Sequence, residues 1–420
     1  MTKPRHAVHA TQKVALKAMV PKALMWMASL VENHATACAT YFLTVLIILL
    51  LFFSGTDCKK PPPIIPPQPT TCEYPAGNRN FTWRLDTIAW WPSEVGGAWA
   101  FSDDDAWVMG NMHGPTVPGQ TFYAGLHWNG RAWNDTIDFY NILVIANDVT
   151  GDSHFMVAAG YYAYAGEKPA IAEFDNTTKK WQRYQFQNPG ELHSVWTDGK
   201  GYFIAVGDSG MVYTKDGYSA GWVYQKAPTN FNFYRVYGVS KNEVYMLAYY
   251  NTSGIDYPQI WRYDGSSWLK LLDDFDSTGT IIKIPNDDNS LGDIYASRCS
   301  ITDSLRLYII GWESYLFETK GSFTDFRATN LSTFGLPLRS LGRTGLDING
   351  FSPNDFWVFG TRYNFYHWNG TDFQKMVIPD LPNDDTQFGD QRKMIKTSSG
   401  KVFLPTEVSS QVYVVVQGTP

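Results

Sequence analysis

The sequence lacks two of the short motifs that identify common enzyme classes. A phosphate-binding loop and a His-Glu-x-x-His metal motif are absent from its 420 residues, and each is the signature of one kind of chemistry. The chain has 8 His and 4 Cys, without the spacing of a zinc site. We therefore predict no metal and no cofactor, and enzymatic activity stays uncertain, with a protein that is not an enzyme favoured.

Charged side chains are also scarce. They make up 18% of the residues, and the formal net charge is −6, which argues against nucleic acid or an anionic membrane surface as the main partner. Aromatic residues are abundant at 16% of the chain, with 16 Trp. Such a composition fits a tightly packed β-protein and would also fit a sugar-binding surface, and core packing is the preferred explanation.

What the sequence does contain is a degenerate repeat. Its clearest copy runs through Asp355–Gly360 and Tyr366–Gly370, and Asp105–Gly110 followed by His127–Gly130 matches it closely. Weaker copies follow at steps of roughly 40–50 residues, with one near 60, which is the period of units with four strands. These copies are Phe155–Gly160, Phe203–Gly207, Glu243–Ala248, Leu307–Gly311 and Lys401–Leu404.

Each copy predicts four antiparallel strands. Its hydrophobic run, rich in β-branched and aromatic residues, suits a second strand that is buried on both faces. The third strand ends in an Asn-Gly or Asp-Gly pair, as at Asn129-Gly130 and Asn369-Gly370, which sets a tight hairpin because such pairs accept a positive φ. The fourth strand carries an aromatic residue near its start, such as Trp133 or Phe373.

The two ends of the repeat region complement each other. The last copy stops after a third strand at Gln411–Val416, and Asn80–Asp86 resembles the fourth strands of other copies. We therefore predict an all-β fold, a seven-bladed β-propeller over residues 79–418. The N-terminal strand would close the last blade, because closure removes exposed sheet edges. An open row of sheets or a β-sandwich is the alternative.

On these repeats the chain resembles bacterial extracellular β-propellers of the broad kelch and galactose-oxidase-central-domain type. It is also similar to the propeller lipoproteins of Bacteroidota-like envelopes. The resemblance covers roughly residues 79–418. Because the repeated residues are structural, the resemblance implies a fold and not a chemistry.

The N-terminal part predicts export and attachment to a membrane. Tyr41–Gly55 is an apolar run of about 15 residues, which is short for a spanning helix and suits a signal sequence. Cys58 and a proline-rich stretch follow. We expect residues 1–57 to be a signal peptide, Cys58 to carry a lipid, and residues 58–78 to be a stiff tether. An uncleaved membrane anchor is the alternative; the expected location is the cell envelope, with secretion as its alternative.

Two cysteines are left over by this interpretation. Cys38 lies before the apolar run and Cys58 is the lipidation candidate, so Cys72 and Cys299 remain. They could form a disulfide in an oxidising compartment. The sequence does not show whether the two residues meet.

The two faces of such a propeller are unequal in this sequence. Turns between first and second strands, and between third and fourth strands, are short. The long insertions belong to the opposite face: Asn111–Thr121, Tyr161–Lys168, Tyr249–Pro258, Asp273–Asp293, Leu331–Thr344 and Asp380–Gln391. Function is often carried by loops on a rigid scaffold, so we expect the binding surface there. The candidate ligand-binding residues are Trp91, His113, Tyr161, Asp208, Tyr250, Trp312, Arg343 and Arg362.

Other polar residues receive structural interpretations. His127 and His367 occupy the same position of two repeats, and Asp103–Asp105 is a turn that recurs in part at Asn354-Asp355. Acidic residues within Asp273–Asp288 could bind calcium, but a solvated acidic loop is the preferred interpretation.

The candidate residues mix aromatic and polar side chains, which suits a saccharide or a peptide. We therefore expect an envelope-anchored binding module for a glycan or an envelope protein. The alternatives are a carbohydrate-active enzyme, hydrolase or lyase, and a scaffold subunit of a surface complex. Two carboxylates about 5–10 Å apart in the channel mouth would favour the enzyme, and a large exposed apolar patch would favour the scaffold.

Overall fold

The computed structural model describes residues 72, 74–113, 122–138, 142, 144–162, 168–252, 255–274, 281–282, 291–311, 314–320, 323, 325–337, 347–360, 364–381, 393–409 and 412–420. The chain divides into two units, Met1–Gln68 and Pro69–Pro420, and every described residue belongs to the second. The predicted signal segment, Cys58 and most of the predicted tether therefore lie outside the described residues.

Antiparallel sheets make up the unit Pro69–Pro420, and five of the described sheets have four strands each. One contains β5 (Val144–Gly151), β6 (Phe155–Tyr162), β7 (Lys168–Asp175) and β8 (Lys180–Gln185). The next contains β9 (Leu192–Thr197), β10 (Tyr202–Gly207), β11 (Met211–Asp216) and β12 (Val223–Lys226). The third contains β13 (Asn232–Ser240), β14 (Glu243–Thr252), β15 (Ile255–Tyr263) and β16 (Trp268–Asp273). The fourth contains β17 (Leu291–Cys299), β18 (Ser304–Gly311), β19 (Tyr315–Lys320) and β20 (Arg327–Asn330). The fifth contains β21 (Asp347–Ser352), β22 (Asp355–Gly360), β23 (Asn364–Trp368) and β24 (Phe373–Met376).

A further sheet of seven strands joins the two ends of the unit. Its order is β25 (Ile395–Lys396), β26 (Val402–Ser409), β27 (Val412–Thr419), β1 (Thr82–Ser102), β2 (Asp105–His113), β3 (Phe122–Trp128) and β4 (Trp133–Asp138). The long β1 has two partners, because residues 82–90 pair with β27 and residues 90–102 pair with β2. The predicted pairing of the N-terminal strand with the last strand is therefore confirmed.

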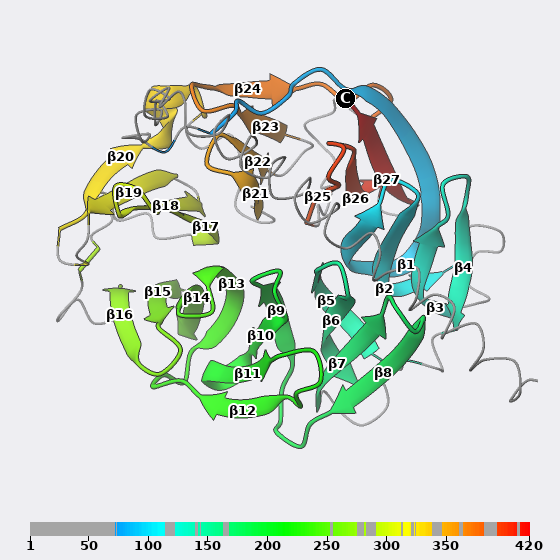
Figure 1. The fold of residues 1–420 in the computed structure, drawn as a ribbon, viewed down its shortest axis with the longest axis horizontal. Helices are drawn as coiled ribbons and strands as arrows, with labels where there is room; N and C mark the ends of the chain where they lie inside the picture. The colour runs from blue at the N-terminus through cyan, green and yellow to red at the C-terminus, as the bar shows by residue number, and fades with distance from the viewer. Residues whose placement is uncertain are drawn as a thin grey trace, which may run out of the picture. The chain divides into compact units, whose positions relative to one another are not determined.

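The sheets stand side by side around a common centre, toward which β5, β9, β13, β17, β21 and β25 lie (Figure 1). This arrangement is an all-β, propeller-like fold. Two short 3-10 helices, η1 (Asp208–Gly210) and η2 (Leu331–Phe334), interrupt it. Within the described part of the chain, none of the helices has the length and apolarity that crossing a membrane requires.

Local sequence explains most of the hairpins. Gly130 and Gly370, which follow β3 and β23, have φ values of +85° and +95°, as the Asn-Gly pairs predict. One expectation was wrong: the Tyr249–Pro258 segment is not an irregular loop. There β14 and β15 continue to pair as far as Thr252 and Ile255, and the aromatic and β-branched residues of the segment favour this extended structure.

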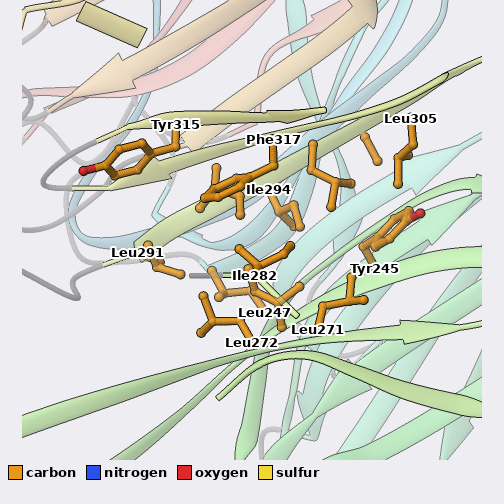
Figure 2. Close-up of a cluster of buried hydrophobic side chains, with 14 residues drawn as sticks. Tyr245, Leu247, Leu271, Leu272, Ile282, Leu291, Ile294, Leu305, Tyr315 and Phe317 are labelled. Carbon is orange, nitrogen blue, oxygen red and sulfur yellow. The ribbon is translucent and has the colours of Figure 1, made fainter. Parts of the chain in front are cut away.

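Large side chains fill the spaces between neighbouring sheets. Figure 2 shows Leu247 and Leu271 of one sheet close to Ile294 and Phe317 of the next. Near the centre, an aromatic ring of one inner strand lies over a glycine of the adjacent strand. A Cβ at Gly350 would lie 1.9 Å from a Tyr295 ring atom, so only glycine allows this close approach.

Two sheets carry the same three-residue cluster. In the His127 cluster, His127 Nε2 lies 2.9 Å from Asp105 Oδ1 and the imidazole stacks on Trp107. In the His367 cluster, which consists of Asp355, Trp357 and His367, the corresponding nitrogen–oxygen distance is 2.8 Å. These contacts agree with the structural role that the repeat predicts for both histidines. Asp105 has a role beyond its turn, because it orients the imidazole.

The chain before β1 is bonded to the sheets. Cys72 and Cys299 form a disulfide with a Cα–Cα distance of 5.7 Å. The Gly77 N–H donates to the Asn354 carbonyl at 2.9 Å, and Asn354 Nδ2 donates to the Tyr74 carbonyl at 2.7 Å. This segment therefore runs along the turns between first and second strands.

Candidate functional site

The unit has two faces that differ in what the strands present. On the loop face the first strands begin and the second strands end, and on the turn face the first and second strands are joined. Because neighbouring strands are antiparallel, the ends of β6, β10 and β14 lie beside the starts of β5, β9 and β13. The residues that follow second strands therefore gather on the loop face.

A row of polar and aromatic side chains crosses the loop face. Glu191 Oε2 accepts a hydrogen bond from Asn147 Nδ2 at 2.8 Å, and His193 Nε2 lies 2.8 Å from Asp208 Oδ1. The His193 ring stacks on Tyr234 with ring centroids 4.7 Å apart, and Tyr234 meets the Tyr249 ring edge-on at 5.7 Å. The loop-face row consists of Asn147, Glu191, His193, Asp208, Tyr234 and Tyr249.

β-Bulges place three members of this row. The register between β5 and β6 skips Asn147, that between β9 and β10 skips His193, and that between β13 and β14 skips Tyr234. A bulge breaks the alternation of a strand and re-aims one side chain. Three inner strands in succession thus present a polar or aromatic side chain at the same level.

The row combines accessible rings with a carboxylate. Tyr234 is 36% exposed, and the neighbouring Tyr250, whose ring stacks on Phe231, is 40% exposed. Burial tends to raise the pKa of Asp208, but hydrogen bonds from His193 and from the Glu191 N–H outweigh it and lower the pKa. Asp208 therefore stays ionised at neutral pH beside the aromatic rings.

Three residues of the row could also hold a cation. One donor atom from each of Glu191, His193 and Asp208 lies within 4.8 Å of the others, and an imidazole with two carboxylates is a ligand set that transition metals accept. Hydrogen bonds inside the group already link His193 to Asp208. The arrangement is thus compatible with a cation and does not require one.

Of the predicted ligand-binding residues, Asp208 and Tyr250 lie with the row, and Tyr161 is half-buried near the end of β6. Trp91 is 64% exposed at the point where β1 changes partners. His113 is buried at 2% exposure, and burial lowers its pKa, so its ring lies inside the fold. Trp312, Arg343 and Arg362 lie outside the described residues.

One segment has the Gly-x-Ser-x-Gly spacing of a nucleophile elbow. It is Gly217-Tyr218-Ser219-Ala220-Gly221, which joins β11 to β12. An elbow needs a strand that turns sharply into a helix, whereas this segment connects two antiparallel strands. The spacing here belongs to a hairpin.

A cavity of about 970 Å³ lies at the centre of the unit, among the inner strands. Its lining includes exposed residues on the side of the turn face: Gly199 and Ser398 in the turns after β9 and β25, Pro75 and Asn78 in the segment before β1, and Pro420 after β27. The cavity therefore opens toward the turn face. Sequence reasoning directed attention to the loop face and missed this site, because the residues that line it come from nine separate segments of the chain.

Polar side chains of the inner strands line the part of the cavity nearer the loop face. We call Asp148, Ser194, Arg235, Asp293, Asp347 and Lys393 the floor. Asp148 Oδ2 accepts from Ser194 Oγ at 2.8 Å and from the Val195 N–H at 3.0 Å, and Asp293 Oδ2 accepts from the Ile348 N–H at 3.0 Å. These bonds satisfy N–H groups on the inner edges of strands, which have no further strand to pair with.

Charges of the floor are paired with one another. Burial tends to lower the pKa of Arg235, but the negative charges of Asp347, Asp293 and Asp148 outweigh it and raise the pKa. Burial, reinforced by the hydrogen bond and charge of Asp347, raises the pKa of Asp293 well above its usual value. The two carboxyl groups are in hydrogen-bond contact, closer than the ~5 Å or more that separates the carboxyl groups of glycosidases.

Seven large apolar side chains are exposed among the described residues. They are Trp91, Val223, Tyr224, Tyr234, Tyr250, Ile301 and Val377. Most of them come from different strands, and single exposed apolar residues are normal on a protein surface. The described surface therefore does not supply the patch that would favour the scaffold hypothesis.

Comparisons with known proteins agree with the fold. No protein-family model and no curated protein sequence matches the chain. A solved structure described as YCF48 bound to D1 peptide matches with a TM-score of 0.52 and 13% identity, over 83% of this chain and 100% of that chain. YCF48 from Cyanidioschyzon merolae matches with a TM-score of 0.50 and 13% identity, over 80% and 99%. The RRP9 WD40 repeats match with a TM-score of 0.50 and 8% identity, over 82% and 99%. At these identities the likeness shows a β-propeller fold alone.

Proposed function

We propose that this protein is a binding module of the cell envelope and that the loop-face row binds a segment of a partner protein. The observation that supports this proposal is the exposed Tyr234 ring, which stacks on His193, the residue that pairs with the ionised Asp208 carboxylate. Tyrosine rings supply large contact areas at low entropic cost. A basic side chain of the partner would contact a ring face and pair with the carboxylate.

The proposal includes finer points of the architecture. We interpret the seven-stranded sheet as two blades that share β1, which together with five four-stranded sheets makes a seven-bladed propeller over residues 79–418. The likeness to kelch and galactose-oxidase repeats and to Bacteroidota-type envelope proteins belongs to the same proposal. A ring closed by β1 and β27 has a rigid rim, which suits a binding face.

The proposed location follows from the N-terminal residues. Residues 1–57 would direct export and Cys58 would carry a lipid, with a plain anchor or secretion as alternatives. Of the expected tether 58–78, only the part before Cys72 would hold the domain away from the membrane, because Cys72, Tyr74 and Gly77 are bonded to the sheets. The Cys72–Cys299 disulfide supports a place outside the cytoplasm, because such bonds persist in oxidising compartments. Radiolabelled palmitate incorporation that Cys58→Ala abolishes would support lipidation.

A peptide array tests the binding function. The full chain would be applied to short synthetic peptides that are basic, neutral or acidic, with a glycan array beside them. We expect binding to basic peptides, weakened at least ~10-fold by Tyr234→Ala or Asp208→Asn, as for a central contact residue. Tyr224→Ala is the matched control, because Tyr224 is similarly exposed at 44% but lies on the outer strand β12.

The outcomes separate the candidate partners. Equal effects of Tyr234→Ala and Tyr224→Ala, or no retention of any peptide, would contradict a peptide site at the row. Glycan binding that Tyr234→Ala removes would instead make the loop face a saccharide site. Salt should weaken peptide binding, since the proposed pairing is between opposite charges near the surface.

A further inference from the structure

Three side chains of the loop-face row converge closely enough to share a metal ion. Among the residues that the structure describes, Glu191, His193 and Asp208 are the one group of three such donors whose atoms lie within 4.8 Å of one another. Two ligands of a tetrahedral zinc ion lie roughly 3.3–3.6 Å apart, since each bond is about 2.0–2.2 Å long. Closing the group by about 1 Å would therefore bring all three atoms to bonding distance.

The position of His193 distinguishes it from the histidines of the repeat. In the His127 and His367 clusters, the imidazole lies against a tryptophan ring at the same position of the repeat. Neither cluster belongs to a group of three converging donors in the described part of the chain. His193 instead lies at the β-bulge near the start of β9. The structural role that the repeat predicts does not account for it.

The two carboxylates of this group also lack a basic partner. Among the described residues, lysine and arginine side chains form no ion pair with Glu191 or Asp208. In the floor of the central cavity, by contrast, Arg235 and Lys393 lie 3.7 Å and 3.8 Å from carboxylate oxygens. When they bind a metal, two carboxylates and a neutral imidazole balance the charge of one divalent cation.

Contacts around the group orient its members. Asn147 Nδ2 donates to Glu191 Oε2 at 2.8 Å, and the Glu191 N–H donates to Asp208 Oδ2 at 3.0 Å. The His193 ring is held by its stacking on Tyr234. Surrounding contacts of this kind fix the ligands of metal sites. The side chains of His193 and Asp208 are 14% and 25% exposed, so an ion can reach them from solvent.

We propose that Glu191, His193 and Asp208 bind one divalent transition-metal ion, such as Zn²⁺, on the loop face. The ligands would be His193 Nε2 and one oxygen of each carboxylate, a set that zinc accepts. The ion would take the place of the hydrogen bond between His193 and Asp208. With three protein ligands, it would keep a fourth position open toward solvent. This site goes beyond the proposed peptide binding and does not depend on it.

Calorimetric titration of the full chain with ZnCl₂, after a chelator has removed bound metal, tests the site. We expect saturable zinc binding. Glu191→Gln keeps the side-chain size and an oxygen that can accept from Asn147, but it removes the charge. It should weaken zinc binding at least ~10-fold, because even the residues that support a ligand contribute about 10–100-fold to metal affinity. His193→Gln removes the imidazole and should weaken zinc binding at least as much.

His127→Gln is the matched control. Its imidazole contacts an aspartate in the same way, and no third ligand among the described residues lies beside it, so this variant should leave the zinc affinity unchanged. Zinc should also raise the thermal unfolding midpoint of the wild type and of His127→Gln more than that of the two ligand variants, since an ion that binds the folded state stabilises it. The same melts establish that each variant is folded.

The outcomes are independent of the peptide-binding function, because the titration contains no peptide. Loss of zinc affinity in both ligand variants, with the affinity of His127→Gln unchanged, would support the metal site. Absence of saturable zinc binding would overturn the proposal. An affinity that both ligand variants leave unchanged, or that His127→Gln lowers equally, would overturn it as well.

Discussion

The His127 and His367 clusters contain the same residue types at the same spacing, yet they differ in burial. The side chains of His127 and Asp105 are 25% and 27% exposed, whereas those of His367 and Asp355 are 0% and 10% exposed. Burial also lowers the pKa of His367, against the opposing effect of Asp355. We therefore expect the same local pattern to contribute differently to the free energy of unfolding in the two sheets.

The chain before β1 accounts for part of this difference. A Cβ at Gly77 would lie 2.6 Å from Asp355 Oδ1 and from His367 Cε1, so the segment packs directly on the His367 cluster. Arg79 donates to the His367 carbonyl at 2.9 Å, and the disulfide fixes the start of the segment. Burial of a local motif thus depends on residues almost 300 positions away in sequence.

Removing the aspartates should give the largest contrast. Asp355→Ala leaves Lys396 and His367 without their anion, and we expect a loss of about 3–5 kcal/mol of unfolding free energy, as for broken buried pairs. Asp105→Ala, in the exposed cluster, should cost about 1 kcal/mol or less. Urea unfolding of the two variants measures both values, and equal losses would contradict the role of burial.

Removing the disulfide should cause the second-largest loss of unfolding free energy. Cys72→Ser combined with Cys299→Ser releases the segment that covers the His367 cluster, and we expect a loss of about 2–4 kcal/mol. In this background Asp355→Ala should lower the free energy of unfolding less than it does in the wild type, because the His367 cluster becomes more exposed to water. A double-mutant cycle from urea midpoints measures this coupling, and a cost that stays unchanged would show that the segment does not shield the cluster.

Acid should weaken the buried His367 cluster. Burial lowers the folded pKa of His367, so below the unfolded value of about 6.5 the unfolded state binds more protons, and stability falls as pH falls toward the folded pKa. The slope for one proton is at most about 1.4 kcal/mol per pH unit. His367→Gln should flatten the profile of unfolding free energy between pH 7 and pH 5, measured by urea unfolding at each pH. A profile that this variant leaves unchanged would assign the acid sensitivity to other groups.

A single methyl group added at Gly77, in the segment before β1, should have the smallest effect on stability. Gly77→Ala places a Cβ against Asp355 and His367 and should cost about 1 kcal/mol through overpacking. Gly221→Ala is the control, because a Cβ there meets nothing within 4 Å. Thermal melts compare the two, and a neutral Gly77→Ala would indicate that the segment moves aside easily.

Only part of the loop-face site could be predicted from sequence. Asp208 follows β10 and Tyr250 lies near the end of β14, so the repeat located them. Glu191, His193 and Tyr234 lie at the starts of inner strands, where β-bulges break the period of two on which strand prediction relies. The Asp–His pairs of the two histidine clusters were not predicted either. The repeat did contain a signal for them, because Asp-x-Trp precedes His-Trp-Asn-Gly in both clusters.

The sequence by itself determined the strands, the tight Asn-Gly turns and the pairing of β1 with β27. These features follow from hydrophobic period, turn chemistry and the missing fourth strand of the last repeat, all of which are local. Only the tertiary structure decided the Cys72–Cys299 disulfide, the burial of the His367 cluster and the lining of the central cavity. The disulfide alone joins residues 227 positions apart. Such contacts arise when the sheets pack around a common centre, and no local pattern specifies which side chains meet there.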